Sequence, residues 1–280
     1  MNILIFTILI WSGSIIAGFL GSLTGLGGGV VIVPLLTLVF GVDIRYAIGA
    51  SLVSVIATSS GAAAAYVKEG FTNIRIGMFL EIATTIGALV GAFLVLRLAT
   101  PTIAIIFGLV LMYSAYLSSH SRSANVAIAK SDSLAVRLRM EGTYPTPQGL
   151  KSYSVGSVPA GFSLMFIAGV VSGLLGIGSG AIKVLAMDRA MRLPFKVSTA
   201  TSNFMIGVTA AASAGVYLNK GYIDPGLTMP VMLGVLLGSS VGAQYLFNAK
   251  TKKLRLLFSI VILILAIEMI YSGLKAGIVK

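Results

Sequence analysis

Runs of about 20 consecutive apolar residues fill most of this chain and restrict the folds open to it. Clear examples are residues 2–24, 46–67, 74–96 and 254–272, each with at most one charged residue in its body. A helix of that length crosses about 30 Å of hydrocarbon. Since 57% of the 280 residues are apolar and only 10% are charged, water is not the main solvent of the folded chain. We predict an all-α polytopic membrane protein.

The sequence also repeats itself. A shift of 151 residues aligns 16–118 with 167–269 without a gap. Identical residues in the alignment include Gly25 and Gly176, Gly27 and Gly178, Gly29 and Gly180, Ser51 and Ser202, and Thr58 and Thr209. The chain is therefore one structural unit used twice.

Each unit is predicted to contain a long apolar segment, a glycine-rich break, a short arm of about 11 residues and three full spans. We expect about 8–10 hydrophobic segments in two transmembrane repeats, 1–118 and 158–280, joined by a polar linker, 119–157. In the linker, Gly142–Pro147 is a loop signal, and 124–140 is expected to hold a short surface helix. The segments are 3–24, 30–40, 46–67, 74–97 and 101–118, then 158–175, 181–191, 198–218, 226–247 and 254–273.

Basic residues indicate how the two repeats are oriented. If each unit has odd parity, the second unit is inverted, and 14 Lys and Arg residues fall on one side of the membrane against five on the other. Parallel repeats would divide them 10 against 9. Because basic loops stay in the cytoplasm, we predict inverted repeats, a cytoplasmic linker and periplasmic termini in a bacterial inner membrane.

Both breaks suit an anion. In Gly25–Gly29 and Gly176–Gly180, glycines permit positive φ and leave main-chain N–H groups unshielded, and a short helix follows each break. Irregular backbone survives inside a membrane only where protein buries it or where it lines a cavity. The substrate-binding residues predicted here are Gly25, Gly27, Gly28, Gly29, Gly176, Gly178, Ser179 and Gly180.

Two other readings of the glycines were weighed. Close helix packing would also use small residues, and we prefer that explanation for Gly87, Gly91, Gly238 and Gly242. A dinucleotide fingerprint would need a strand–helix–strand unit, which the flanking spans exclude.

Lys183 stands out because it replaces Ile32 of the first unit three residues after the second break. An ionisable group at membrane depth is a functional candidate, although snorkelling to the interface would also explain it. Polar residues of the next segment complete the predicted site: Ser51, Ser54, Thr201, Ser202 and Asn203. Each of these alone would also serve as a helix–helix hydrogen bond.

Glu81 and Glu268 are the two acids inside apparent spans, and Asp188 ends the second short arm. A proton relay is one reading of them, but they occupy different repeat positions. The chain has no cysteine, no nucleophile–base pair and no cluster of metal ligands, so we expect no enzyme activity, cofactor or metal. The net charge of +12 lacks the aromatic-interleaved soluble face of a nucleic-acid reader, so no nucleic acid is expected.

The string Gly25-Leu26-Gly27-Gly28-Gly29-Val30-Val31-Ile32-Val33-Pro34, with its echo from Gly176, resembles the TauE/SafE sulfite exporter family, also called the 4-toluene sulfonate uptake permeases. The resemblance covers essentially the whole chain and implies an inner-membrane permease for sulfite, organosulfonates or related sulfur oxyanions. It points to the glycines of both breaks. The chain departs from the pattern at Ser179 and lacks a proline at Leu185.

The expected function is a secondary transporter that exports a small sulfur oxyanion by alternating access, with membrane lipid as its surroundings. An interior-negative potential favours the exit of negative charge by about 2.3 kcal/mol per charge per 100 mV. An anion-selective channel is the alternative. The sequence leaves homo-oligomerisation and the coupling ion open.

Overall fold

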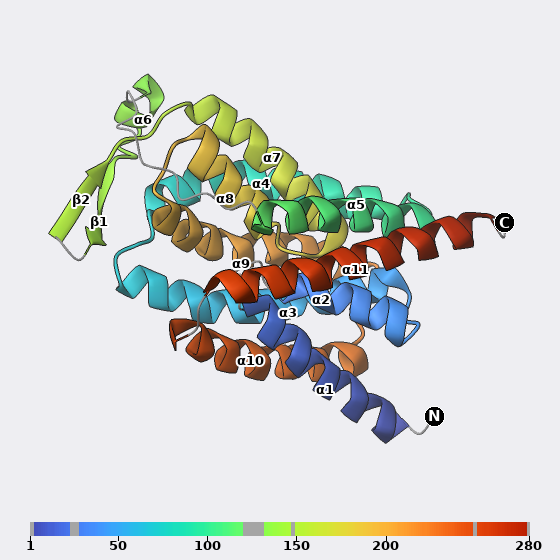
Figure 1. Cartoon of the computed structure of the whole chain (residues 1–280). Helices are drawn as coiled ribbons and strands as arrows, with labels where there is room; N and C mark the ends of the chain where they lie inside the picture. Colours follow the sequence, from blue (N-terminus) through green and yellow to red (C-terminus); the bar gives the residue numbers. More distant parts are fainter. Residues whose placement is uncertain (1–2, 23–27, 120–131, 147–148, 249–250, 279–280) are drawn as a thin grey trace.

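A computed structural model describes residues 3–22, 28–119, 132–146, 149–248 and 251–278. These residues form a bundle of long helices with a small β-hairpin at one end, opposite the two chain termini (Figure 1). The first unit contains α1 (Ile3–Ser22), α2 (Gly29–Pro34), η1 (Leu35–Val39), α3 (Ile44–Lys68), α4 (Ile74–Val95) and α5 (Thr100–Ser119). The second contains α7 (Val158–Leu175), α8 (Gly180–Leu185), η2 (Ala186–Ala190), α9 (Phe195–Asn219), α10 (Pro225–Asn248) and α11 (Thr251–Ile278).

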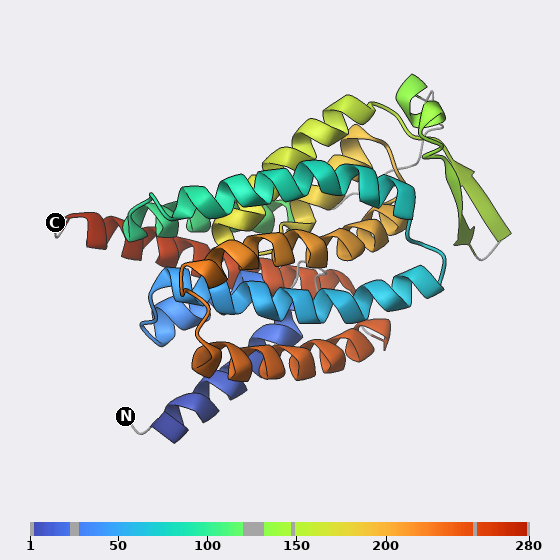
Figure 2. The same ribbon diagram turned by 180° about the vertical axis from the view of Figure 1, so that it is seen from behind.

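The two units interleave rather than stand apart. Helix α1 packs against α10, α4 against α7, α5 against α11 and α3 against α9 (Figures 1 and 2). Helix α4 also packs against α9, and α10 against α3. Every one of these pairs takes one helix from each unit, so neither unit has a core of its own.

The close contacts between helices recur at repeat-related positions. A Cβ at Gly87 would overlap the Phe166 carbonyl oxygen, and a Cβ at Gly238 would overlap that of Ile15. These two contacts are the same one with the units exchanged, since each residue lies 151 positions from its counterpart. The packing role predicted for Gly87, Gly91 and Gly238 is therefore confirmed. The surroundings of Gly242 lie outside the described part of the structure.

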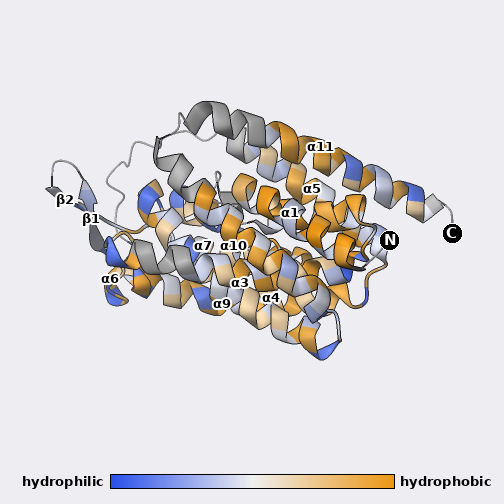
Figure 3. Cartoon of the chain, turned by 90° about the horizontal axis from the view of Figure 1, so that it is seen from below, coloured by the Kyte–Doolittle hydropathy of each residue, from blue (hydrophilic) through white to orange (hydrophobic). Residues whose placement is uncertain are grey.

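The outer surface of the bundle is apolar. On α4, Met78, Ile82, Ile86, Val90 and Phe93 are exposed at helical spacing, while the opposite face of the helix is buried. Figure 3 shows hydrophobic colour along the helices and hydrophilic residues gathered toward the ends of the bundle. Among the described residues, three helices meet the length and hydropathy of a membrane span: Ile74–Val95, Val158–Leu175 and Ser259–Gly277. The chain is an all-α membrane protein, as predicted.

Both predicted short arms are present. Each begins as a short α-helix, α2 or α8, and continues as a π-helical turn, η1 or η2. An arm of about 11 residues rises only about 16 Å, too little to cross the hydrocarbon. Pro34 stands before the first π turn, but Leu185 stands before the second, so the turn does not require a proline.

The linker differs from its prediction. The expected loop at Gly142–Pro147 forms β1 (Gly142–Thr146), paired in antiparallel register with β2 (Gly149–Tyr153). A two-stranded hairpin tolerates Pro145, since each of its strands has a free edge. Of the surface helix expected over 124–140, the structure describes α6 (Ser133–Arg137), and the part before residue 132 lies outside the described residues.

Candidate functional site

The second break is a tight turn between α7 and α8. Gly176 and Gly178 have φ of +67° and +70°, and Ser179 has φ of +46°. Glycine adopts this left-handed region freely, whereas a residue with a Cβ is strained there. The turn stops α7 at Leu175 and restarts the helix at Gly180. The predicted interruption of the helix is therefore present in the second unit.

The first break is described only from Gly28 onward, so Gly25 and Gly27 lie outside the described residues. The Gly28 carbonyl accepts the first hydrogen bonds of α2, from the N–H groups of Val31 and Ile32, each at 3.1 Å. Gly28 and Gly29 are buried. The start of the first short arm therefore lies inside the protein, as does that of the second.

The two breaks meet. A Cβ added at Gly29 would lie 2.9 Å from the Gly176 carbonyl oxygen and 2.5 Å from the Ser51 Oγ. The Ser51 hydroxyl donates to the Gly176 carbonyl at 2.7 Å, so α3 of the first unit holds the break of the second. Close approach of backbone to backbone explains why only glycine fits at position 29.

Lys183 lies on α8 one turn after Ser179 and is fully buried, with an exposed fraction of 0%. Its Nζ donates to the Thr209 hydroxyl on α9 at 2.6 Å. An ammonium group in this position has lost its water, which is expensive unless a counter-charge compensates. The snorkelling alternative does not describe the side chain, because its amine reaches another helix and not the surface.

Glu81 supplies the counter-charge. The Thr209 hydroxyl donates to Glu81 Oε1 at 2.7 Å, and the Thr85 hydroxyl donates to the same oxygen at 3.1 Å. Thr209 therefore stands between the ammonium and the carboxylate. We call Lys183, Thr209 and Glu81 the relay triad. It joins α8, α9 and α4, and so both units.

Two oxygens beside this chain of hydrogen bonds have no partner among the described residues. They are Oε2 of Glu81 and Oγ of Ser179, each shielded from solvent. Buried polar atoms in folded proteins are nearly always hydrogen-bonded, so orphans of this kind indicate a ligand or a movement. Ser179 occupies the strained turn of the break, four residues from Lys183.

The remaining predicted site residues divide into two groups. Ser202 donates to the Gly180 carbonyl at 3.4 Å and joins Ser51 at the second break. Ser54 and Asn203 bond carbonyls of their own helices, those of Ala50 and Thr199. The Thr201 hydroxyl accepts the backbone N–H of Asn73 at 3.0 Å, which ties α9 to the loop between α3 and α4.

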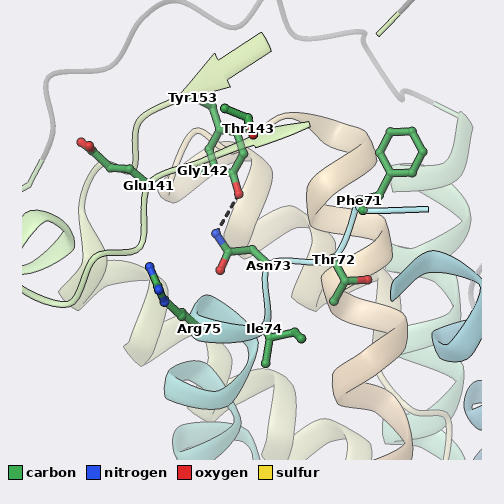
Figure 4. Close-up of a pocket in the computed structure, with 10 residues that line it drawn as sticks. Phe71, Thr72, Asn73, Ile74, Arg75, Glu141, Gly142, Thr143 and Tyr153 are labelled. Carbon is green, nitrogen blue, oxygen red and sulfur yellow. Dashed lines mark hydrogen bonds between the residues drawn. The ribbon is translucent and has the colours of Figure 1, made fainter. Parts of the chain in front are cut away.

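A cavity of about 270 Å³ lies at the hairpin end of the bundle, away from the breaks. Figure 4 shows Asn73 pointing to Tyr153, whose hydroxyl accepts from the amide at 2.7 Å. Burial raises the pKa of the Tyr153 hydroxyl, and the bond from Asn73 opposes that shift. These contacts fasten the hairpin to the bundle.

Sequence reasoning missed the relay triad as a unit. Thr209 was visible only as a repeat match of Thr58, and Glu81 only as one of several acids. The signal that points to their pairing is charge: within the apolar segments, a buried cation needs an anion, and Glu81 is the acid on a helix that packs against α9.

Interleaved membrane helices, two short interrupted arms and a buried charge define a polytopic membrane protein of the transporter class. A model of the family described as Sulfite exporter TauE/SafE matches residues 10–269. The chain belongs to this family, which confirms the resemblance found in the sequence.

Curated relatives carry the same class of name. The chain is 29% identical over 276 residues to "Probable membrane transporter protein YunE" of Bacillus subtilis, covering 96% of this chain and 98% of that one. It is 27% identical over 234 residues to "Probable membrane transporter protein YdhB" of the same organism, covering 82% and 85%. A "Probable membrane transporter protein" of Xylella fastidiosa is 24% identical over 276 residues, with 98% of each chain covered. No solved structure matches the chain.

Proposed function

We propose that the protein is a secondary transporter that exports sulfite, or a related sulfur oxyanion or organosulfonate, across the inner membrane by alternating access. The observation that carries the proposal is the buried Lys183 ammonium one turn from the place where two interrupted helices meet. A positive charge and main-chain amides at one point are the chemistry that holds a small oxyanion.

The opposite courses of equivalent helices support inverted repeats. In Figure 1, α1 runs toward the end of the bundle that carries the hairpin, and α7 runs away from it. Helices α3 and α9, and likewise α5 and α11, also run in opposite directions. Inverted repeats bring two discontinuous helices to one central site, around which the halves rock.

The charges support an orientation with the hairpin in the cytoplasm and both termini outside. Basic residues of the hairpin end include Lys68, Arg75, Arg137, Arg139 and Lys151. Basic loops are retained on the cytoplasmic side of a membrane, where the anionic leaflet also attracts them.

The proposed anion site consists of both breaks and their polar neighbours. The glycines, including Gly25 and Gly27, present N–H groups, while Lys183 supplies the charge. Ser51, Ser179 and Ser202 are the hydroxyls closest to the second break, and a hydroxyl donates to an oxyanion without adding charge. Thr201, Ser54 and Asn203 would join only after a change of partner, because each is hydrogen-bonded elsewhere.

Burial of the site supports alternating access over an open pore. Lys183 and Ser179 are 0% and 3% exposed, so an anion reaches them only when the helices move. A transporter cycle supplies such a movement from each side in turn.

The test is efflux of labelled sulfite and methanesulfonate from liposomes that contain the purified protein. We expect saturable efflux well above that of empty liposomes, and faster efflux when unlabelled anion is added outside. Rates equal to those of empty liposomes for both anions would end the proposal. Efflux that grows linearly with concentration, without counterflow, would favour the anion channel instead.

A further inference from the structure

The relay triad has no counterpart in the other half of the protein. The repeat places Ile32 where the second unit has Lys183, and Met232 where the first has Glu81. Thr58, the counterpart of Thr209, donates to carbonyls of its own helix, those of Ser54 and Val55. The fold therefore forms the same helix junction once with a charge pair and once without.

This asymmetry bears on why the charges are there. Two buried charges are expensive to desolvate, and an apolar replacement of a buried ion pair is often neutral or stabilising. The first half shows that apolar residues suffice at this junction. A pair retained in one half only is better explained by a task than by stability.

Glu81 is also poised to change its state of charge. Its Oε1 accepts two hydroxyl donors, while its Oε2 has no partner among the described residues. A second anion beside Lys183 would repel the carboxylate in surroundings that screen charge weakly. Uptake of a proton on Oε2 removes that repulsion and leaves Oε1 as an acceptor for Thr209.

Lys183 is the charged group that faces Glu81 among the described residues. Helix α7, which packs along α4, contains no ionisable side chain. On α9, Lys196 is exposed and the Tyr217 hydroxyl is bonded to the α7 backbone. Arg75 of α4 itself is exposed at the hairpin end. A charge change at Glu81 is therefore felt mainly by Lys183.

We propose that Glu81 carries a proton together with the substrate: a sulfur monoanion, such as an alkanesulfonate or hydrogen sulfite, replaces Glu81 as the counter-charge of Lys183, and Glu81 takes up one proton. When the anion leaves, the proton leaves from Oε2 and the relay triad re-forms. One monoanion and one proton move no net charge, so the pH difference across the membrane acts on transport and the potential does not. This inference rests on the proposed function.

The test measures binding of methanesulfonate to the purified protein in detergent as the pH is varied, because the charge of this probe is fixed over the range. Protonated Glu81 favours the anion, so affinity rises as the pH falls. We expect the Kd to fall by about tenfold for each unit of pH wherever free Glu81 is ionised. Glu81→Gln imitates the protonated form, and its Kd should not depend on pH. Glu268→Gln is the control, since Glu268 is exposed on α11 and should keep the wild-type slope.

The outcomes separate the two proposals. If the wild-type protein transports sulfite but does not bind methanesulfonate, or binds it with a Kd independent of pH, the inference on Glu81 is overturned and the transport function stands. A slope that persists in folded Glu81→Gln also overturns it. The wild-type slope decides the question of proton uptake even if the variant does not fold. If sulfite and methanesulfonate are neither bound nor transported, both proposals fail.

Discussion

Replacement of Lys183 by methionine is expected to reduce anion transport by about 100-fold or more. Methionine fills a similar volume without a charge, so the anion loses its counter-charge in a buried site. Removal of one partner from a buried, hydrogen-bonded charge pair costs about 2–5 kcal/mol, and each 1.4 kcal/mol is tenfold in binding. The measurement is the initial rate of labelled sulfite efflux from liposomes with equal amounts of wild-type and variant protein.

Lys220→Met is the matched control for this variant. Lys220 is exposed at the end of α9, so its loss removes an equal charge far from the breaks. We expect near wild-type efflux from the control. Equal rates for Lys183→Met and wild type would remove Lys183 from the anion site, provided that both proteins elute as one species in detergent.

Gly91→Ala is expected to lower stability by about 3 kcal/mol, a large effect for a single methyl group. A Cβ at Gly91 would overlap the Val170 carbonyl oxygen, and backbone cannot move aside as a side chain can. Overpacking of this kind costs about 1–3 kcal/mol, and here it separates α4 from α7 along a small-residue contact. The thermal midpoint in detergent, followed by loss of soluble monodisperse protein, measures the effect.

Gly215→Ala provides the comparison. Gly215 lies within α9, and a Cβ there meets no atom within 4 Å. Alanine should stabilise this helix by about 0.5–1 kcal/mol, because glycine is a poorer helix former. Equal midpoints for the two alanine variants would show that α4 and α7 do not touch at Gly91.

The architecture followed largely from local rules. Apolar runs predicted the long helices, since hydrocarbon leaves the backbone few alternatives. Glycines in the pattern Gly176-Ile177-Gly178 predicted the break, and the structure places positive φ at both glycines. The β-hairpin was missed, because Pro145 and its neighbours carry the signals of a loop and the pairing partner is set by register rather than by composition.

The site followed only in part. Lys183 was conspicuous as a charge in an apolar arm, and its burial needed no knowledge of the fold. Its partners depend on which helices lie side by side. The repeat aligns Glu81 with Met232, so symmetry hides the acid, and only the packing of α4 against α9 brings it to Thr209.

Ser202 and Thr201 show the same limit on a smaller scale. They are adjacent in sequence and equally polar, yet one hydroxyl reaches the Gly180 carbonyl and the other binds the Asn73 amide. Consecutive residues of a helix point about 100° apart, so the helix rotation decides which of them reaches the break. Rotation within a bundle is a result of packing, which the sequence pattern alone does not fix.

The most direct test of the account is an experimental structure of the protein with selenite bound, located by the anomalous scattering of selenium. Selenite has the shape and charge of sulfite. The account predicts one selenium peak between Gly29 and Gly180, with an oxygen of the anion within hydrogen-bond distance of Lys183 Nζ. A peak only at the hairpin end, or α7 and α8 joined as one continuous helix, would contradict it.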